Sequence, residues 1–325
     1  YISQPSLTNA IHELEKEMGI NIFNRSNKGI SPSIEGEVFL GYARQVLEQA
    51  KVLEDKYKGD DGGKKSFCVS TQHYSFAVNA FVDLIKRYGQ DEYDFSIRET
   101  QTYEIIDDVA RMRSEIGILF MNDFNEKVLN KILRANDLEF HELFVAKPHV
   151  FISRKHPLAK NDIIINEELE AYPYLSFEQG EHNSFYFSEE IFSTTERKKN
   201  IRVRDRATLF NLLIGLNGYT VCSGVIDEKL NGKDIISVPL ADESDMRIGY
   251  IVHRKAILSR LGNTYLGALT NYLTAGSDEP EDSVKIPQRK LQHRGRFNEM
   301  RDDGEPACGD VREKAAEHMR RVKTT

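Results

Sequence analysis

Residues 3–19 read SQPSLTNAIHELEKEMG, and this stretch decides how the N-terminal part of the chain folds. Its apolar residues recur every three or four positions, which places them in one stripe of a helix. They are Leu7, Ile11, Leu14 and Met18. Ser3 is a good N-cap, Pro5 falls in the first turn, and Gly19 supplies a C-terminal stop. The sequence therefore predicts a helix over residues 4–18 whose apolar stripe faces a core.

The opposite face of the predicted helix is polar and carries few charges. Side chains of this kind suit base edges and phosphates in the major groove of DNA. The next segment favours the same use, because the tetrad SNKG at residues 26–29 lies between short apolar segments and predicts a β-hairpin with cations near its tip. The residues predicted to contact DNA are Ser3, Gln4, Pro5, Ser6, Thr8, Asn9, His12, Lys16, Arg25 and Lys28.

A helix followed by a cationic hairpin indicates a winged helix-turn-helix over residues 1–32, although periodicity alone equally allows another small domain. Further identities narrow the choice. They are Ser3-Gln4-Pro5-Ser6-Leu7-Thr8, Ile11, Leu14-Glu15, Met18-Gly19, Ile22-Phe23, Arg25 and Gly36. In these residues the chain resembles the DNA-binding domain of the LysR-type transcriptional regulators. That domain begins upstream of Tyr1 in the family, so the resemblance implies a partial winged helix-turn-helix and an N-terminally truncated chain.

Residues 33–58 predict a long helix capped by Ser33. Its apolar positions alternate spacings of four and three, which is the pattern of a heptad seam. The seam consists of Phe39, Ala43, Val46, Ala50, Leu53 and Tyr57. A lone core helix is the alternative, but a seam this regular favours a dimer interface, and the resemblance implies the family's long linker helix.

Two segments fall outside these patterns. Residues 59–65 are glycine-rich and charged without a preceding strand, which predicts an interdomain hinge and not a phosphate-binding loop. From residue 276 to 325 eleven Lys or Arg and eleven Asp or Glu accompany only six Leu, Ile, Val or Phe, so too little apolar surface is available to offset chain entropy. Residues 274–325 are therefore predicted to be a disordered tail, either an unusual extension or a gene-boundary artefact.

Residues 66–273 alternate predicted strands and helices, which indicates an α/β fold with mostly parallel sheets. The predicted strands are 66–70, 95–99, 116–120, 150–154, 174–177, 201–204, 219–223, 235–239 and 248–253, with amphipathic helices such as 76–88, 103–113 and 209–216 between many of them. Two successive alternating blocks suggest two lobes separated by a cleft. The resemblance implies the same arrangement, a periplasmic-binding-protein-like effector domain.

Ligands of open α/β sheets bind beyond the carboxyl ends of the strands, so we expect the effector site there. Hydroxyls and free N–H groups at two strand-to-helix junctions should converge on one point, where the helix ends favour an anion. A small organic carboxylate is therefore the expected effector. Capping or core packing is the alternative role for each residue taken singly. The predicted effector-binding residues are Ser70, Thr71, Gln72, His73, Thr100, Gln101, Thr102, Phe120, Phe151, Phe177, Arg206, Thr208 and Ser223.

Composition and motifs exclude several other classes of protein. The net charge of -7 argues against non-specific polyanion binding by the whole chain, and the three cysteines form no CxxC pair, so neither a disulfide framework nor a zinc site is indicated. No apolar run approaches the roughly 18 residues of a membrane span. No nucleophile elbow, zinc-protease motif, P-loop or dinucleotide fingerprint is present, and paired carboxylates such as Glu189-Glu190 are expected on solvated helix faces.

The sequence thus predicts a cytoplasmic transcription factor that is not an enzyme and needs no cofactor or metal. Its expected partners are double-stranded promoter DNA, a small-molecule effector and further copies of itself, as a dimer or tetramer, with no membrane. A solute-binding receptor whose first 57 residues are incidental is the main alternative. An enzyme of two-lobed fold is the other.

Overall fold

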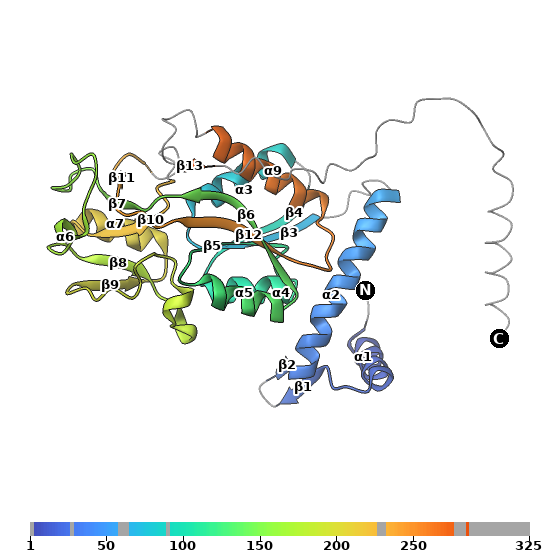
Figure 1. Cartoon of the computed structure of the whole chain (residues 1–325). Coiled ribbons are helices and arrows are strands. Elements are labelled where there is room, and N and C mark those ends of the chain that lie inside the picture. Colours follow the sequence, from blue (N-terminus) through green and yellow to red (C-terminus); the bar gives the residue numbers. More distant parts are fainter. Residues whose placement is uncertain are drawn as a thin grey trace, which may run out of the picture. The chain divides into compact units, whose positions relative to one another are not determined.

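The computed structural model describes residues 3–26, 29–57, 65–88, 92–225, 232–275 and 284–285 (Figure 1). Its helices are α1 (Gln4–Met18), α2 (Ile34–Tyr57), α3 (Ser75–Tyr88), α4 (Thr102–Ala110), α5 (Glu126–Ala135), α6 (Asn166–Leu169), α7 (Arg206–Leu216) and α9 (Arg260–Ala275), with the 3-10 turns η1 (Gly180–His182) and η2 (Phe185–Phe187). Its strands are β1 (Phe23–Ser26), β2 (Gly29–Pro32), β3 (Lys65–Thr71), β4 (Tyr93–Glu99), β5 (Ile116–Met121), β6 (Leu138–Ala146), β7 (His149–Ser153), β8 (Tyr174–Phe177), β9 (Asn200–Val203), β10 (Tyr219–Cys222), β11 (Ile235–Pro239), β12 (Met246–His253) and β13 (Val284–Lys285).

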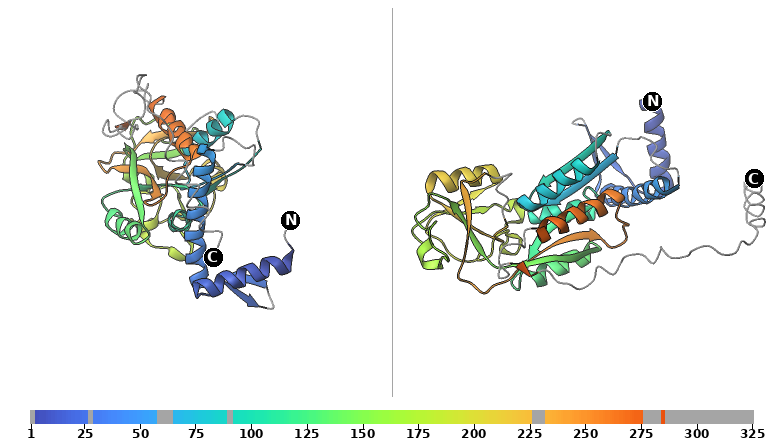
Figure 2. Two further views of the ribbon diagram at one scale, coloured as in Figure 1. Left: turned by 90° about the vertical axis from the view of Figure 1, so that its right-hand side faces the viewer. Right: turned by 90° about the horizontal axis from the view of Figure 1, so that it is seen from above.

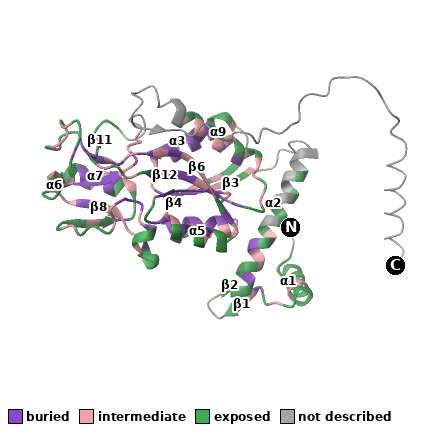
Figure 3. Ribbon diagram, viewed as in Figure 1, coloured by how far each residue is buried: buried purple, intermediate pink, exposed green. Residues whose placement is uncertain are grey.

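Helix α1 has the bounds and the caps that its sequence predicts. The Ser3 side chain accepts a hydrogen bond from the Ser6 N–H, and Gly19 ends the helix in the left-handed conformation at φ 69°. The predicted burial of its apolar stripe is wrong for this chain, because no residue of α1 is buried and Leu7 and Met18 are about half exposed. Figure 3 shows this contrast between α1 and the buried sheets.

The predicted hairpin is confirmed. Strands β1 and β2 pair antiparallel, with Arg25 opposite Ile30. Glu15 of α1 holds the hairpin, since its Oε1 accepts the N–H groups of Ile22 (2.7 Å) and Phe23 (3.1 Å). Lys28, predicted to contact DNA from the hairpin tip, lies outside the described residues.

Helix α2 begins where Ser33 was predicted to cap it. The Ser33 hydroxyl accepts the Gly36 N–H at 2.8 Å and also bonds the Asn21 carbonyl. Along the predicted seam Val46, Ala50 and Leu53 are exposed, while Phe39 and Ala43 are half-buried. The side chain of Tyr57, the last seam residue, lies outside the described part of the chain, as do residue 58 and residues 59–64 of the predicted hinge.

Gly36 lets α2 pass close to the backbone of Ile22, which lies between α1 and β1. A Cβ built on Gly36 would lie 1.9 Å from the carbonyl oxygen of Ile22, a residue that is 2 % exposed. We expect Gly36→Ala to lower the free energy of unfolding of this part of the chain by about 1–3 kcal/mol, because backbone and not a flexible side chain must move. Gly267→Ala in α9 is the matched control, since its Cβ would meet nothing within 4 Å. Thermal unfolding followed by circular dichroism measures both, and equal melting curves would refute the argument.

Two sheets form the larger part of the molecule. The first has the order β13-β6-β12-β5-β3-β4, with α3 packed against α9 on one face and α4 and α5 on the other (Figures 1 and 2). The second has the order β11-β7-β10-β8-β9. The chain crosses from the first sheet to the second between Ala146 and His149 and returns between Pro239 and Met246. The predicted two lobes therefore correspond to two sheets joined by two crossings.

The prediction of mostly parallel sheets is wrong. Strand β3 pairs parallel with β4 and β5, and β8 pairs parallel with β9 and β10, but β12 pairs antiparallel with β5 and β6, and β7 pairs antiparallel with β10 and β11. Strands β7 and β12 make these antiparallel pairs, and each comes directly after a crossing between the lobes. Each runs opposite to the strands beside it in the sheet that the chain enters. Strand β6 was not predicted, and β13 pairs with it inside the region predicted as a disordered tail. The rest of that region beyond α9 lies outside the described residues.

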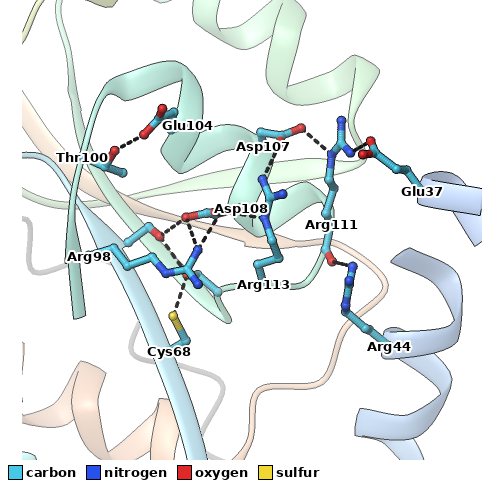
Figure 4. Close-up of polar contacts among 12 residues, drawn as sticks. Glu37, Arg44, Cys68, Arg98, Thr100, Glu104, Asp107, Asp108, Arg111 and Arg113 are labelled. Carbon is cyan, nitrogen blue, oxygen red and sulfur yellow. Dashed lines mark hydrogen bonds and ion pairs between the residues drawn. The ribbon is translucent and has the colours of Figure 1, made fainter. Parts of the chain in front are cut away.

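Asp108 on α4 is the centre of a polar network inside the first lobe (Figure 4). It is 5 % exposed, accepts the Ser70 hydroxyl at 2.6 Å and pairs with Arg113 at 2.7 Å. One turn away, Arg111 pairs with Asp107 at 2.6 Å and with Glu37 of α2, and the Arg44 guanidinium donates to the Arg111 carbonyl at 3.1 Å. The C-terminal end of α4 thus contacts α2 directly.

Candidate functional site

The carboxyl ends of the parallel strands from both lobes meet at a cleft, and His73 and Glu189 lie at its centre. Glu189 Oε2 accepts the backbone N–H of His73 at 3.0 Å, and the two carboxylate oxygens lie 3.0 and 2.9 Å from His73 Nδ1. His73 Nε2 lies 3.1 Å from the Arg204 carbonyl, and the imidazole stacks on Phe177 with ring centroids 3.8 Å apart. Both partners of the pair have side chains that are almost completely buried.

The His73 imidazole is favoured in its charged form. Burial alone would lower the pKa of His73, but the Glu189 carboxylate beside it more than offsets burial, so the pKa is raised above its ordinary value. Each buried charge requires the opposite charge close by, because an unpaired charge would be strongly destabilising in the cleft.

A second set of bonds joins the lobes at the start of α4. The Thr102 N–H donates to Gln179 Oε1 at 3.1 Å, and the Thr102 hydroxyl donates to the Phe187 carbonyl at 2.7 Å. The Gln72 amide donates to the same hydroxyl at 2.6 Å. The Gln101 side chain lies within 3 Å of the position that a Cβ on Gly180 would take, and Gly180 has a φ of 55°. Residues 179–187 therefore close the cleft against the first lobe.

Glu190 lines the cleft, and Glu99 lies next to it, paired with Arg206. Burial, together with the neighbouring Glu189, raises the pKa of Glu190 from 4.5 to about 8, even though its Oε1 accepts the Phe177 N–H at 2.7 Å. Burial also raises the pKa of Glu99, with Arg206 partly offsetting the rise from 2.9 Å away. The cleft therefore holds one neutral carboxyl near neutral pH and two carboxylates with cationic partners.

The free space in the cleft is small. A cavity of about 50 Å³ is lined by His73, Tyr74, Ser75, Phe151, Phe177, Glu189, Glu190, Arg206, Leu209, Phe210, Thr220, Val221, Cys222, Ser223 and Val225. Pockets for organic ligands usually measure about 300–1,000 Å³. An organic molecule can therefore enter only if the side chains or the lobes rearrange.

The structure brings together only part of the predicted effector-binding set. Eight of its members lie at the cleft, namely Gln72, His73, Gln101, Thr102, Phe151, Phe177, Arg206 and Ser223. Phe120 lies outside the cavity among Asn122, Phe185 and Ile191, and its N–H donates to Gln72 Oε1 at 3.0 Å.

The predicted convergence of hydroxyls is wrong. Ser70 donates to Asp108 at 2.6 Å and Thr71 to the Gln72 carbonyl at 2.7 Å. Thr100 bonds Glu104, and Thr208 bonds Asp205, the N-cap of α7, at 2.8 Å. Ser70 and Thr71 are buried, where an unpaired hydroxyl is costly, and the less buried Thr100 and Thr208 bond carboxylates three or four residues away in sequence.

The sequence prediction missed the acidic residues that dominate the cleft. Glu189 and Glu190 were expected on a solvated helix face, yet they are 7 % and 4 % exposed. A signal for their burial was present, because aromatic residues 185–187 precede them and Ile191-Phe192 follows. Carboxylates flanked by apolar residues on both sides do not form the polar face of a helix.

The face of α1 predicted to contact DNA is open to solvent. Seven of its eight positions are exposed and Thr8 is half-buried; Arg25 on the hairpin is also exposed. His12 Nδ1 lies 3.3 Å from Glu15 Oε2. The polar face therefore needs no rearrangement within α1 to meet a partner.

In the part of the chain that the structure describes, no three His, Cys, Asp or Glu side chains are placed to hold a metal ion. The described helices include none with the length and apolar character of a membrane span.

Comparison with known proteins identifies the family. The model of the LysR substrate binding domain matches residues 67–273. The HTH-type transcriptional regulator YbhD of Escherichia coli K12 is 23% identical over 295 residues, which cover 89% of each chain. The regulator YnfL of the same organism is 26% identical over 181 residues, which span 54% of this chain and 57% of YnfL.

Solved structures support the same fold. A full-length variant of OxyR from Pseudomonas aeruginosa superposes with a TM-score of 0.58 at 18% identity, over 84% of this chain and 86% of OxyR. The sequence match and the shared two-lobed fold agree with the winged hairpin, the linker helix and the cleft described above. The chain therefore belongs to the family of LysR-type transcriptional regulators.

Proposed function

We propose that the protein binds promoter DNA as a dimer or tetramer in the cytoplasm and that a small molecule held in the cleft controls this binding. The single observation that carries the proposal is the exposed polar face of α1, which the hairpin β1–β2 flanks and the partly exposed seam of α2 follows. A groove-reading helix and a self-association seam have no use in a solute-binding receptor. We assign no enzymatic activity, cofactor or metal to the chain.

We propose one role for each of the predicted segments. Residues 1–32 contact DNA, residues 33–58 dimerise, residues 59–65 act as a hinge, residues 66–273 bind the effector, and residues 274–325 form a tail. In the effector domain a small organic carboxylate is the proposed ligand, because backbone N–H groups, His73 and Arg206 at the cleft are donors suited to an anion.

Asn9→Ala tests the DNA-binding face. If Asn9 reads a base edge, its loss should weaken binding to a preferred sequence by about 1–3 kcal/mol and leave binding to random DNA almost unchanged. Lys28→Ala should weaken both and flatten the dependence on salt, because a lysine at the hairpin tip contacts phosphate and not bases.

Fluorescence anisotropy can measure both variants on a duplex selected from a random-sequence pool and on a scrambled duplex. Glu13→Ala, also exposed on α1, is the matched control. Unchanged affinity in both Asn9→Ala and Lys28→Ala would show that this face does not contact DNA. Failure to select any duplex, with ligand binding retained, would favour the receptor alternative.

A further inference from the structure

The Glu189 carboxylate occupies a site built for an anion. Besides the His73 N–H and imidazole, the Gln179 amide donates to Glu189 Oε1 at 3.3 Å. These donors come from the segment before α3 in the first lobe and from the segment after β8 in the second. A bound carboxylate with three donors and a side chain 5 % exposed is the environment that an anionic ligand requires.

We propose that Glu189 is a built-in ligand of the effector site, and that an effector binds by placing its own carboxylate where the Glu189 carboxylate now lies. This inference rests on the proposed effector function and defines the group that the effector must carry. In this exchange the effector carboxylate takes the place of the Glu189 carboxylate. The His73 pair and the donors stay satisfied, and the number of buried charges does not change.

Displacement follows from the space and the charge of the cleft. The cavity of about 50 Å³ shares its wall with Glu189, so moving this side chain enlarges it. An anion that entered while Glu189 stayed in place would lie beside the Glu189 carboxylate and near Glu99, and among the described residues His73 and Arg206 are already paired with these two groups. Withdrawal of Glu189 avoids this repulsion.

A cationic ligand fits the site less well. Glu99 is already paired with Arg206, and Glu189 with His73. Glu190 is the remaining carboxyl, and burial raises its pKa to about 8, so it is mostly neutral at pH 7. None of the three offers an unpaired negative charge to an added cation.

Chemical rescue tests the inference without knowledge of the natural effector. Glu189→Ala in the full chain removes the Cγ methylene and the carboxylate, which should leave the donors facing a space that the carboxylate and methylene of propionate can fill. Sodium propionate should then raise the melting temperature of Glu189→Ala by about 3–6 °C once its concentration is tenfold above its dissociation constant. Propionamide at equal concentration and sodium chloride at equal ionic strength should not.

The controls separate a carboxylate site from general salt effects. The wild type should not respond to propionate, because this small acid makes no further contacts that would let it displace the covalently attached Glu189 carboxylate. Glu196→Ala, at an exposed position of the same segment, should not respond either. A propionate response equal in all three proteins, or none in Glu189→Ala, would overturn the inference. DNA binding measured on the same samples distinguishes this failure from failure of the proposed function, because loss of rescue leaves the DNA-binding result untouched.

A second variant covers the case in which Glu189→Ala does not fold. Glu189→Gln keeps the shape of the side chain and removes its charge, so the pKa of His73, followed by NMR, should fall below its wild-type value. A His73 pKa that is unchanged in Glu189→Gln would show that the Glu189 charge does not act on this site, and would also overturn the inference.

Discussion

Glu190 is expected to make the stability of the protein fall as the pH rises from about 5 to 8, and Glu190→Gln is expected to remove this contribution. The folded-state pKa of Glu190 is about 8, against 4.5 for an ordinary glutamate. Between these values the folded protein holds a proton that the unfolded chain has lost, so each rise in pH favours unfolding. The stabilisation is complete below the unfolded pKa and is lost as the pH approaches 8.

Urea unfolding at a series of pH values measures this effect, whose upper limit is several kcal/mol because each unit of pKa shift corresponds to about 1.4 kcal/mol. Glutamine preserves the acceptor for the Phe177 N–H and cannot ionise. Glu196→Gln, which is exposed, should keep the wild-type profile. The slope that remains in Glu190→Gln is set by other groups, because the raised pKa values of His73 and Glu99 act in the same direction as Glu190. The pKa values of His149, His156 and His253 are lowered by burial and act in the opposite direction. Identical profiles for wild type and Glu190→Gln would disprove the role of Glu190.

Replacing Val46 and Leu53 together by lysine is expected to abolish dimers formed through α2. Both side chains are exposed in the single chain, at 68% and 59%, and lie one heptad apart on the predicted seam. In a dimer each lysine would bring a charge into a contact between apolar surfaces, which costs several kcal/mol when the charge has no partner. Sedimentation equilibrium should show monomers at concentrations where the wild type is dimeric.

Leu47→Lys is the matched control for the seam. Leu47 is 69% exposed but lies one position off the seam, where lysine is common in paired helices. This variant should remain dimeric. If the double variant dimerises as tightly as the wild type, the chains associate through another surface, and if Leu47→Lys alone dissociates them, the register of the seam is wrong.

Local pattern was sufficient to predict much of the fold. The bounds of α1 follow from Ser3 and Gly19, and those of β8 and β11 from apolar runs between polar residues. Strand β6 was missed because glutamates and a histidine interrupt its apolar residues. Its hydrogen bonds to β12 and β13 depend on residues a hundred or more positions away, which no local pattern reveals.

The candidate site was likewise predicted only in part from local pattern. The rule that ligands lie beyond strand ends placed His73, Thr102 and Arg206 at the cleft. It did not identify their partners, since Glu189 lies 116 residues from His73 in sequence and reaches it from the other lobe. It also failed for Ser70, because a strand-end hydroxyl bonds whatever acceptor packing provides, and Asp108 lies on the adjacent helix.

The position of α4 connects the cleft with α2. Its first residue, Thr102, bonds the second lobe across the cleft, while Arg111, at its other end, contacts Glu37 of α2. A helix of this length is about 14 Å long and behaves as a short rigid rod. A tilt that separates Thr102 from Gln179 therefore also moves Arg111. Thermodynamic reciprocity then requires that DNA, by fixing α2, changes the affinity of the cleft for its ligand by the same factor by which the ligand changes the affinity for DNA.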